Sequence, residues 1–435
     1  MSKPAARPRR ARPRLLARVF GRLRESPNLA IVLGLGLALL FLGWASGFWV
    51  LIRAAYLLLA LVPIGWLWAR ANVKGLRLEV RRGPDRLHAG ETTYSSFRLQ
   101  NLDGYPKLWL EVEEPTNMPG VAPKSVTFLT ANGTRTWRHE VLCRRRGRYT
   151  FGPVAVASGD PFGLFRRRHV FGDMWEVLVF PAPVELPYFW LPSAQLSGEG
   201  DRSRPTPYIT PTASGVREYH PGDAFSRIHW LTTARLRRLM VKTFDFTPTS
   251  DVWLVLDLER GVHAGEGDES TEEYMVTAAC SLAHRLLGHD LRVGYLAQGE
   301  ELYLFPPARG PQQYERIMEA LAVLEANGQV PLGQVLLANE RSFGRHTTLI
   351  VITPSVEEDW VTAVQALVQR GVQAAVVLLD AGTFGGQEAS LLSFSALAAH
   401  DILTYLVRRG DDLSLALGPS GASSAYWLHR SWKER

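Results

Sequence analysis

Two carboxylates, those of Asp257 and Glu259, lie at the end of the apolar segment DVWLVLDL at residues 251–258. An acidic residue that follows a buried strand stands where α/β proteins bind metals and nucleotides. Carboxylate oxygens are preferred Mg²⁺ ligands, and a bound metal can activate water for hydrolysis. A hard cation, however, needs several oxygen ligands that converge in near-octahedral geometry. One or two carboxylates on one loop do not supply them, so we expect no bound metal. We expect Asp257 to cap a helix or to accept hydrogen bonds from loop amides.

Other motifs for catalysis or cofactor binding are missing from the sequence. No GxxxxGK[ST] segment follows a strand, and the glycine-rich GTFGG at residues 382–386 lacks the lysine of a phosphate-binding loop. No GxSxG nucleophile elbow occurs, and GPSGA at residues 418–422 has the wrong spacing. The two cysteines, Cys143 and Cys280, lie far apart, which gives no zinc ligand pair and fits a reducing compartment. We therefore expect a protein that is not an enzyme and has no cofactor.

The segment REYHPGDAFSRIHWLTTARLRRLMVKTFD, residues 217–245, is crowded with charge yet has no catalytic spacing. Its PGD sequence predicts a turn, residues 226–238 predict a short helix, and LMVKTFDF predicts an edge strand. Packing accounts for the apolar residues but does not require so many charges. Two interpretations stay open: salt bridges between domains, or a surface complementary to a protein partner. The candidate partner-binding residues are Arg217, Glu218, Tyr219, Pro221, Gly222, Asp223, Arg227, Trp230, Arg235 and Lys242.

The basic character of the chain is concentrated at its start. Residues 1–28 hold nine Lys or Arg against Glu25, a charge of +8, whereas the whole chain carries +7. The remainder is therefore close to neutral, which argues against a nucleic-acid-binding domain and favours contact of the tail with anionic lipid. The runs RRRGR (144–148) and FRRRH (165–169) are not interleaved with an aromatic stacking platform. We expect their cations to face an acidic partner or lipid headgroups.

Residues 29–70 predict two transmembrane helices, near Leu29–Ala45 and Phe48–Trp68, with a tight turn at Ser46 and Gly47. Tryptophans near the ends of both segments fit an aromatic belt. Arginines flank the outer ends, so the positive-inside rule places residues 1–28 and the soluble regions in the cytoplasm, and the protein in the cell membrane. The alternatives are a cleaved signal peptide and one long buried helix.

The soluble part divides by its hydrophobic pattern. Residues 74–190 show short alternating runs between turn residues, which predict an antiparallel, immunoglobulin-like β-sandwich of about seven strands. Residues 191–250 contain a polar linker and the charged segment. Residues 251–435 alternate apolar strands with helical segments, which predicts a doubly wound α/β domain with a mostly parallel sheet.

Several motifs together resemble one bacterial family. REYHPGD, SRIHW and VKTFD precede a strand that ends in Asp257, and RRRGRYTFGP, GDPFGLF and LVFP lie upstream. The chain thereby resembles the domain of unknown function fifty-eight family, whose domain is similar to the von Willebrand factor A fold and whose members commonly begin with two membrane spans. The resemblance implies a non-enzymatic scaffold or adaptor that works with a MoxR-type AAA+ ATPase in assembling or maturing other complexes.

The resemblance also bears on metal binding, because von Willebrand A domains often hold Mg²⁺ through a DxSxS strand end, a Thr and a further Asp. Asp257 matches the first position, but Glu259 and Gly261 replace both serines. Pro354 stands where the further Asp is expected, and GQVPLGQ at residues 328–334 offers no Thr. The resemblance therefore implies a degenerate metal position at Asp257 and Glu259. Two other functions remain open: a metal-dependent hydrolase that uses these carboxylates, and an envelope-binding module outside the cell.

Overall fold

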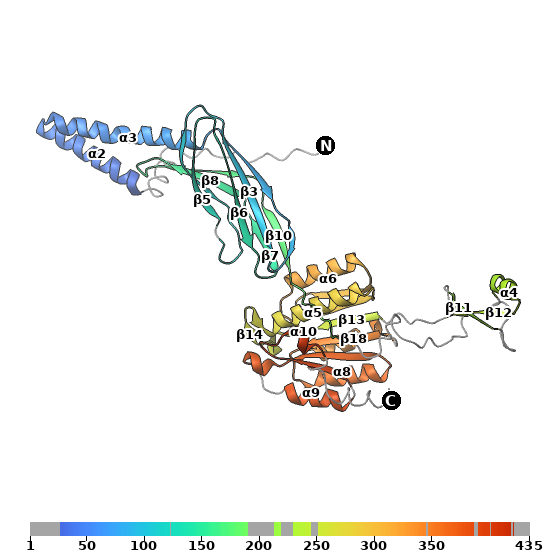
Figure 1. The fold of residues 1–435 in the computed structure, drawn as a ribbon. Coiled ribbons are helices and arrows are strands. Elements are labelled where there is room, and N and C mark those ends of the chain that lie inside the picture. The colour runs from blue at the N-terminus through green and yellow to red at the C-terminus, as the bar shows by residue number, and fades with distance from the viewer. Residues whose placement is uncertain are drawn as a thin grey trace, which may run out of the picture. The chain divides into compact units, whose positions relative to one another are not determined.

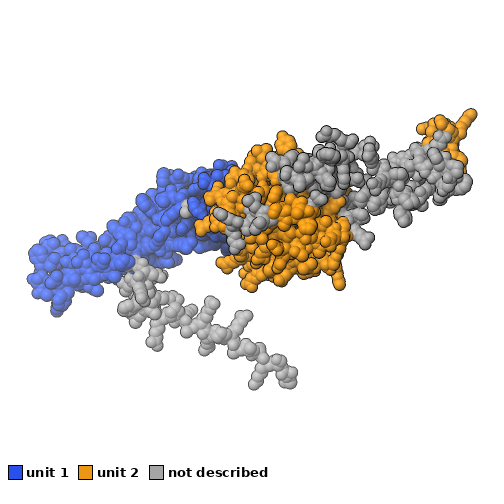
Figure 2. All heavy atoms as spheres, turned by 90° about the horizontal axis from the view of Figure 1, so that it is seen from below, with its two compact units in different colours: residues 1–179 blue, residues 180–435 orange. Residues whose placement is uncertain are grey.

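The computed structural model describes residues 27–121, 123–189, 213–218, 229–244, 251–344, 347–386, 390–400, 402–418 and 421. The chain forms two compact units, residues 1–179 and residues 180–435 (Figure 2). The first unit contains a pair of apolar helices followed by a β-rich region, and the second contains an α/β sheet (Figure 1).

The two apolar helices are α2 (Pro27–Ser46) and α3 (Trp49–Val73). Both are long and apolar enough to cross a membrane. Gly47, with φ +66°, forms the turn between them, as predicted. Helix α3 continues five residues beyond the predicted end at Trp68 because its polar last turn packs on the β-rich region, where the Asn72 amide donates to the carbonyl of Leu108 (3.1 Å). Apolarity alone predicts the membrane-length part of this helix but not its extension.

The β-rich region contains ten strands within the described residues. They are β1 (Leu76–Arg82), β2 (Arg86–His88), β3 (Thr92–Asn101), β4 (Lys107–Glu113), β5 (Lys124–Leu129), β6 (Thr134–Leu142), β7 (Gly147–Phe151), β8 (Val154–Gly159), β9 (Arg166–Phe171) and β10 (Trp175–Phe180). They form antiparallel sheets in the orders β1-β3-β6, β2-β10-β7 and β5-β4-β8-β9. Alternate residues of β3, β4 and β8 point into a shared core that includes Phe97, Leu110 and Val156.

The strand number exceeds the predicted seven for local reasons. Residues 148–158 form two strands rather than one run, because the chain turns at Gly152 (φ +80°) between β7 and β8. The arginine-rich residues 166–171 form β9, which lies at the edge of its sheet. Charged side chains are common on such edges because they discourage pairing with other chains, and they hide the alternating pattern of a strand.

Part of the charged segment forms a small element that we call the β11–α4–β12 element. It consists of β11 (Ala213–Glu218), α4 (Trp230–Leu236) and β12 (Met240–Phe244), and the two strands pair antiparallel. Residues 226–228 of the predicted helix lie outside the described residues, and the described helix ends two residues before the predicted end at position 238. It ends where Arg237 adopts the left-handed conformation (φ 51°), which breaks the helical hydrogen-bond pattern.

The α/β sheet has the strand order β17-β16-β13-β18-β19-β20. All its strands are parallel except β17, which pairs antiparallel with β16. The strands are β13 (Asp251–Leu256), β16 (Val293–Gln298), β17 (Leu302–Ala308), β18 (Thr347–Thr353), β19 (Gln373–Leu379) and β20 (Leu403–Val407). The larger helices are α5 (Thr271–Gly288), α6 (Pro311–Val323), α7 (Leu332–Ala338), α8 (Glu358–Gln369) and α9 (Ser390–Ala399).

Helices cover both faces of this sheet. Helices α5 and α6 lie on one side and α8 and α9 on the other (Figure 1). Strand β13 is buried on both faces, which explains its unbroken apolar sequence. Sequence analysis missed β17, whose exposed and half-buried residues alternate at the sheet edge, and α7, which has only seven residues. Short elements of this kind carry too little periodicity to be recognised.

Candidate functional site

The strand order places Asp257 at a topological switch point. Strand β13 connects onward to β16 on one side, whereas its other neighbour, β18, begins the second half of the sheet. Ligands of open α/β sheets bind outside the carboxyl ends of strands at such a point. Asp257 directly follows β13, and Thr353 is the last residue of β18. The two side chains therefore meet although 96 positions separate them in the chain.

Both oxygens of the Asp257 carboxylate have hydrogen-bond partners within the protein. The Thr353 hydroxyl donates to Oδ2 over 2.6 Å, and the Glu259 amide donates to Oδ1 over 3.1 Å. The same Thr353 hydroxyl accepts from the Ser355 amide over 2.9 Å. Asp257 is only 1% exposed and Thr353 is buried. This carboxylate therefore holds the two loops together and accepts from a loop amide, as predicted.

Burial changes the protonation of this site. It raises the pKa of Asp257 to about 6, and the hydrogen bonds from Thr353 and from the Glu259 amide oppose that rise. The charges of Glu259 and Glu357 raise this pKa further. Burial, followed by the charge of Glu357, also raises the pKa of Glu259. The pKa values of Asp257 and Glu259 are thus both raised at the end of the sheet, and raised pKa values of this kind are frequent at functional sites.

His263 fastens the loop that follows Asp257. Its Nε2 lies 2.8 Å from the Asp257 carbonyl oxygen, and its Nδ1 lies 3.0 Å from the Thr271 hydroxyl. A carbonyl oxygen only accepts, so Nε2 carries the proton and Nδ1 accepts from the hydroxyl. Burial lowers the pKa of His263, which favours this neutral form. The imidazole ties the start of α5 to the end of β13.

The structure corrects one expectation about this edge. Sequence analysis considered only Pro354 in the loop after β18, but Thr353 and Ser355 on either side bring hydroxyl groups from a second loop. The edge is therefore richer in oxygen donors than predicted. Within the described ranges, however, the His, Cys, Asp and Glu side chains form no group of three or more that could hold a metal ion.

The loop at residues 328–334 approaches the site through its backbone. The Gly328 amide donates to the Leu258 carbonyl (2.8 Å), and the Arg260 amide donates to the Gly328 carbonyl (2.9 Å). A Cβ at position 328 would lie 2.7 Å from the Gln298 carbonyl oxygen, so only glycine fits between the neighbouring backbone segments. This loop therefore completes the wall of the site without contributing a side-chain ligand there.

The predicted partner-binding residues fall partly within the β11–α4–β12 element. Arg217 and Glu218 lie on β11 opposite Val241 and Met240, and Lys242 lies on β12 opposite Val216. Trp230 and Arg235 lie on α4 and are exposed. The remaining candidates lie outside the described residues: Tyr219, Pro221, Gly222, Asp223 and Arg227.

Hydrogen bonds fix α4 against β12. The His229 amide donates to the Met240 carbonyl (2.8 Å), and the Met240 amide donates to the Thr233 hydroxyl (3.0 Å). His229 Nδ1 also accepts from the Thr232 amide (3.2 Å) and caps the helix. The main chain is thus tied down locally while large apolar side chains face outward: Trp230 is 66%, Leu236 47% and Leu239 40% exposed.

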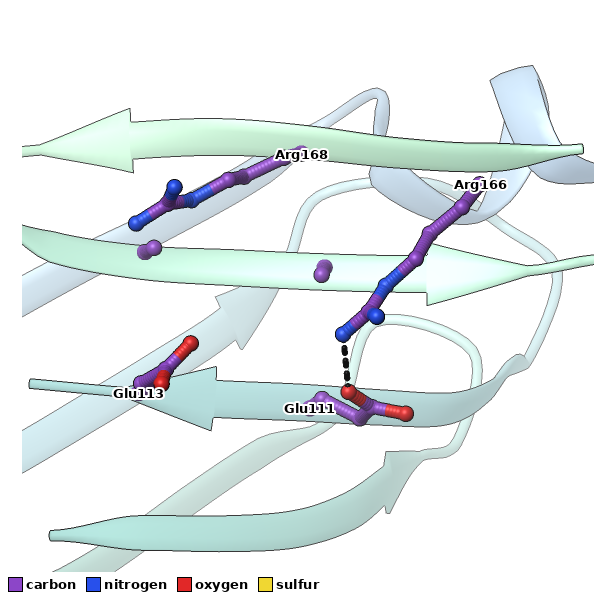
Figure 3. A pocket seen from close by; sticks show the side chains of 6 residues that line it. Glu111, Glu113, Arg166 and Arg168 are labelled. Atoms are coloured by element: carbon purple, nitrogen blue, oxygen red, sulfur yellow. Dashed lines mark hydrogen bonds and ion pairs between the residues drawn. The ribbon is translucent and has the colours of Figure 1, made fainter. Parts of the chain in front are cut away.

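A hollow of about 350 Å³ lies on one face of the sheet β5-β4-β8-β9 (Figure 3). Glu111 and Glu113 of β4 face Arg166 and Arg168 of β9 across the strand between them. The lining is completed by Ala155 and Ala157 of β8. Arg166 forms an ion pair with Glu111. At least this cation of the FRRRH run therefore has an acidic partner in its own sheet, where an external partner had been expected.

Comparison with known proteins shows which family this chain resembles. Residues 215–383 match the model of the family described as protein of unknown function DUF58. This confirms the resemblance inferred from the motifs. A related protein, the uncharacterized protein YeaD of Bacillus subtilis, is 24% identical over 314 residues, which cover 70% of this chain and 76% of YeaD.

Solved structures show weaker likeness to this chain. The conserved hypothetical protein BatB from Bacteroides thetaiotaomicron matches with a TM-score of 0.31 and 17% identity, over 42% of this chain and 99% of BatB. The CARDB domain of PF1109 from Pyrococcus furiosus matches with a TM-score of 0.19 and 16% identity, over 24% of this chain and 94% of that domain. Likeness at this level carries no conclusion about function.

Proposed function

We propose that this protein is a membrane-anchored, non-enzymatic adaptor that binds other proteins through its β11–α4–β12 element. We further propose a MoxR-type AAA+ ATPase as the partner, as the family resemblance implies. The observation that carries the proposal is the exposure of Trp230, Leu236 and Leu239 on an element whose main chain is held by its own hydrogen bonds. Tryptophan and arginine dominate the energetics of protein interfaces, and Arg235 lies on the same helix.

The anchoring part of the proposal rests on helices α2 and α3. A core helix of a soluble protein is mostly buried, yet these helices expose apolar side chains such as Ile31 (64%) and Leu57 (73%). Their glycines allow close helix packing, because a Cβ at Gly36 would lie 2.7 Å from Leu59. With basic residues outside both ends of the pair, we infer that both termini and the two soluble regions lie in the cytoplasm.

The non-enzymatic part of the proposal draws on the Asp257 site. The carboxylate already bridges Thr353 and the Glu259 amide, which is the arrangement of a structural tie. Burial also raises the pKa of Cys280 to about 12 and raises that of Cys143, which makes both thiols poor nucleophiles. We interpret the α/β unit as von Willebrand A-like with a degenerate metal position, and the β-rich region as immunoglobulin-like.

Site-specific crosslinking tests the partner surface. A photoreactive amino acid at position 230 of the full-length protein, coexpressed with the MoxR-type ATPase of the same genome, should crosslink to that ATPase. Met174 is 63% exposed on the β-rich region and provides a matched control position that should not crosslink. Equal crosslinking from positions 230 and 174, or none from either, would contradict the assignment of this surface.

The raised pKa values of Asp257 and Glu259 favour one second candidate, a metal-dependent hydrolase. A bound cation stabilises the folded state by an amount that grows with the logarithm of its concentration above the dissociation constant. Thermal unfolding with Mg²⁺ or Mn²⁺ therefore separates the two functions: the adaptor predicts no shift, and an increase that grows with cation concentration and is lost in Asp257→Asn supports the hydrolase. A reporter fused after Arg435 tests the third alternative, an envelope-binding module outside the cell.

A further inference from the structure

The loop at residues 160–165, between β8 and β9, lies against the apolar helix pair. Its Asp160 side chain packs on α3 at Gly65, where an added Cβ would lie 3.2 Å from the Asp160 Cγ. Its Gly163 carbonyl accepts from the Asn28 side-chain amide of α2 over 3.4 Å. The loop therefore touches both helices at once, and its height along them is fixed by these contacts.

That height coincides with the end of the apolar part of both helices. Asn28 is the second residue of α2, and Gly65 directly precedes Trp66 in α3. The guanidinium of Arg70 lies over the Trp66 ring at 5.6 Å. Tryptophan and arginine at a helix end mark the boundary between hydrocarbon and headgroups. In a membrane-spanning protein the loop thus lies at the bilayer surface.

The conformation of the loop exposes its aromatic tip. The Asp160 carboxylate accepts from the amides of Phe162 (2.9 Å) and Phe165 (2.5 Å), and Leu164 is buried beneath the loop. Pro161 is exposed and Phe162 is 48% exposed. The loop thus holds Leu164 inward and presents the ring of Phe162 outward.

We propose that Phe162 inserts into the interfacial region of the bilayer in which α2 and α3 are anchored, so that the β-rich region has a second contact with the membrane. The inference rests on the proposed membrane anchoring. The occupant of the surface is lipid because the loop that carries the exposed ring is held against both apolar helices through Asp160 and Gly163. Basic residues at the same end, Arg70 and Lys74, are exposed toward the level of the phosphates.

The end of α3 holds this geometry rigidly. Asn72 donates to the Ser158 hydroxyl (3.2 Å), one strand end away from the loop. Buried Lys107 donates to the carbonyls of Ala71 (2.5 Å) and Lys74 (2.8 Å), which satisfies carbonyls at the helix end. The loop, the strands and the helix therefore form one packed body, and Phe162 keeps its position relative to the bilayer.

Spin labels on the full-length protein test the insertion. The native cysteines are both buried, so a cysteine introduced for Phe162 is labelled selectively. The protein is placed in nanodiscs of phosphatidylcholine and phosphatidylglycerol, and accessibility is measured to oxygen, which favours lipid, and to a nickel chelate, which favours water. For F162C we expect an oxygen-to-nickel ratio several-fold above that of the control M174C.

Met174 is a suitable control because it lies at the other end of the β-rich region. Strand β1 leads from Leu76, beside the end of α3, to Arg82, a distance of about 20 Å. A Cβ at Gly152 would lie 3.3 Å from both Arg82 and the Asp173 carbonyl oxygen, which places Met174 near that far end. Should F162C fold poorly, P161C provides the same test at the neighbouring exposed residue.

A third label, L57C in α3, separates this inference from the proposed anchoring. A high ratio at position 57 combined with equal, low ratios at positions 162 and 174 would overturn the insertion and leave the anchoring intact. Low ratios at all three positions would refute the anchoring and the insertion with it. High ratios at 57 and 162 and a low ratio at 174 are the result we expect.

Discussion

Replacing Asp257 with asparagine tests how the carboxyl edge of the α/β sheet is stabilised. Burial raises the pKa of Asp257 from 3.8 to about 6, so the folded protein binds a proton more tightly than the unfolded chain does. The folded state is therefore favoured at low pH, and the free energy of unfolding falls as the pH rises from about 4 to 6. Asparagine keeps the shape of the protonated acid and carries no charge. The variant should thus lack this pH dependence.

The size of the effect follows from the pKa. The interval from 3.8 to about 6 corresponds to about 3 kcal/mol at 1.36 kcal/mol per pH unit. Asp257 is 1% exposed, so solvent screening reduces this figure little. For a unit of this size, 1 kcal/mol moves the melting temperature by roughly 2–4 °C. Asp257→Asn should then melt roughly 6–12 °C above the native protein at pH 8, and the difference should vanish as the pH approaches 4.

Scanning calorimetry of the full-length protein in detergent, at pH 4 to 8, measures this difference. The exposed carboxyl of Glu358 provides a control, because Glu358→Gln removes a charge near the same edge without emptying the buried site. A difference that does not change with pH, or a variant that is less stable than the native protein at pH 8, would refute the reasoning. The latter result would show that the ionised carboxylate is required for stability, as it is where a cation is bound.

Four further outcomes are expected. Thr353→Val removes the hydroxyl that links Asp257 to the Ser355 amide and should lower the free energy of unfolding by about 1–3 kcal/mol. The control Thr348→Val, also buried on β18, should lower it less, and equal losses of the two variants in urea unfolding would count against the link. Lys107→Met strands the carbonyls of Ala71 and Lys74 and should destabilise the first unit by about 3–5 kcal/mol in the same assay; a neutral result would contradict the buried cap. Gly65→Leu should displace Asp160 and increase proteolysis of the loop at residues 160–165, while Gly34→Leu, with no atom within 4 Å of its Cβ, should not; identical digestion patterns would argue against the packing. Maleimide should label Cys143 and Cys280 only after denaturation, because burial raises the pKa of both thiols; labelling of the native protein within minutes, followed by mass spectrometry, would disprove this.

The helices and central strands were predictable because their hydrophobic patterns are local. Helices α2 and α3 were recognised because a helix that crosses a bilayer needs about 20 apolar residues in a row. Strand β13 was recognised because a strand buried on both faces has an unbroken apolar sequence. The cap of α5 is local in the same way, because Ser270 accepts from the Glu273 amide only three residues later, over 3.2 Å. These signals depend on residues a few positions apart.

The carboxyl edge was only half predictable because its partners are distant in the chain. Asp257 was identified from its strand end, but its partnership with Thr353 depends on β13 and β18 being neighbours in the sheet. A threonine at the end of an apolar strand is a common feature, so the sequence gives no reason to single it out. The acidic partner of Arg166 in β9 was hidden for a related reason, since Glu111 lies two strands away in the sheet.

Lys107 and Asn72 join a membrane-length helix to a β-sheet with no flexible connection between them, since β1 begins three residues after α3 ends. Such a joint transmits torque. Under the proposed anchoring, a change in the inclination of the helix pair, whether caused by bilayer thickness or by a neighbouring protein in the membrane, rotates the attached strands as well. The proposed anchoring would thus make the first unit a lever that converts movement within the lipid plane into displacement on the other side of the headgroups.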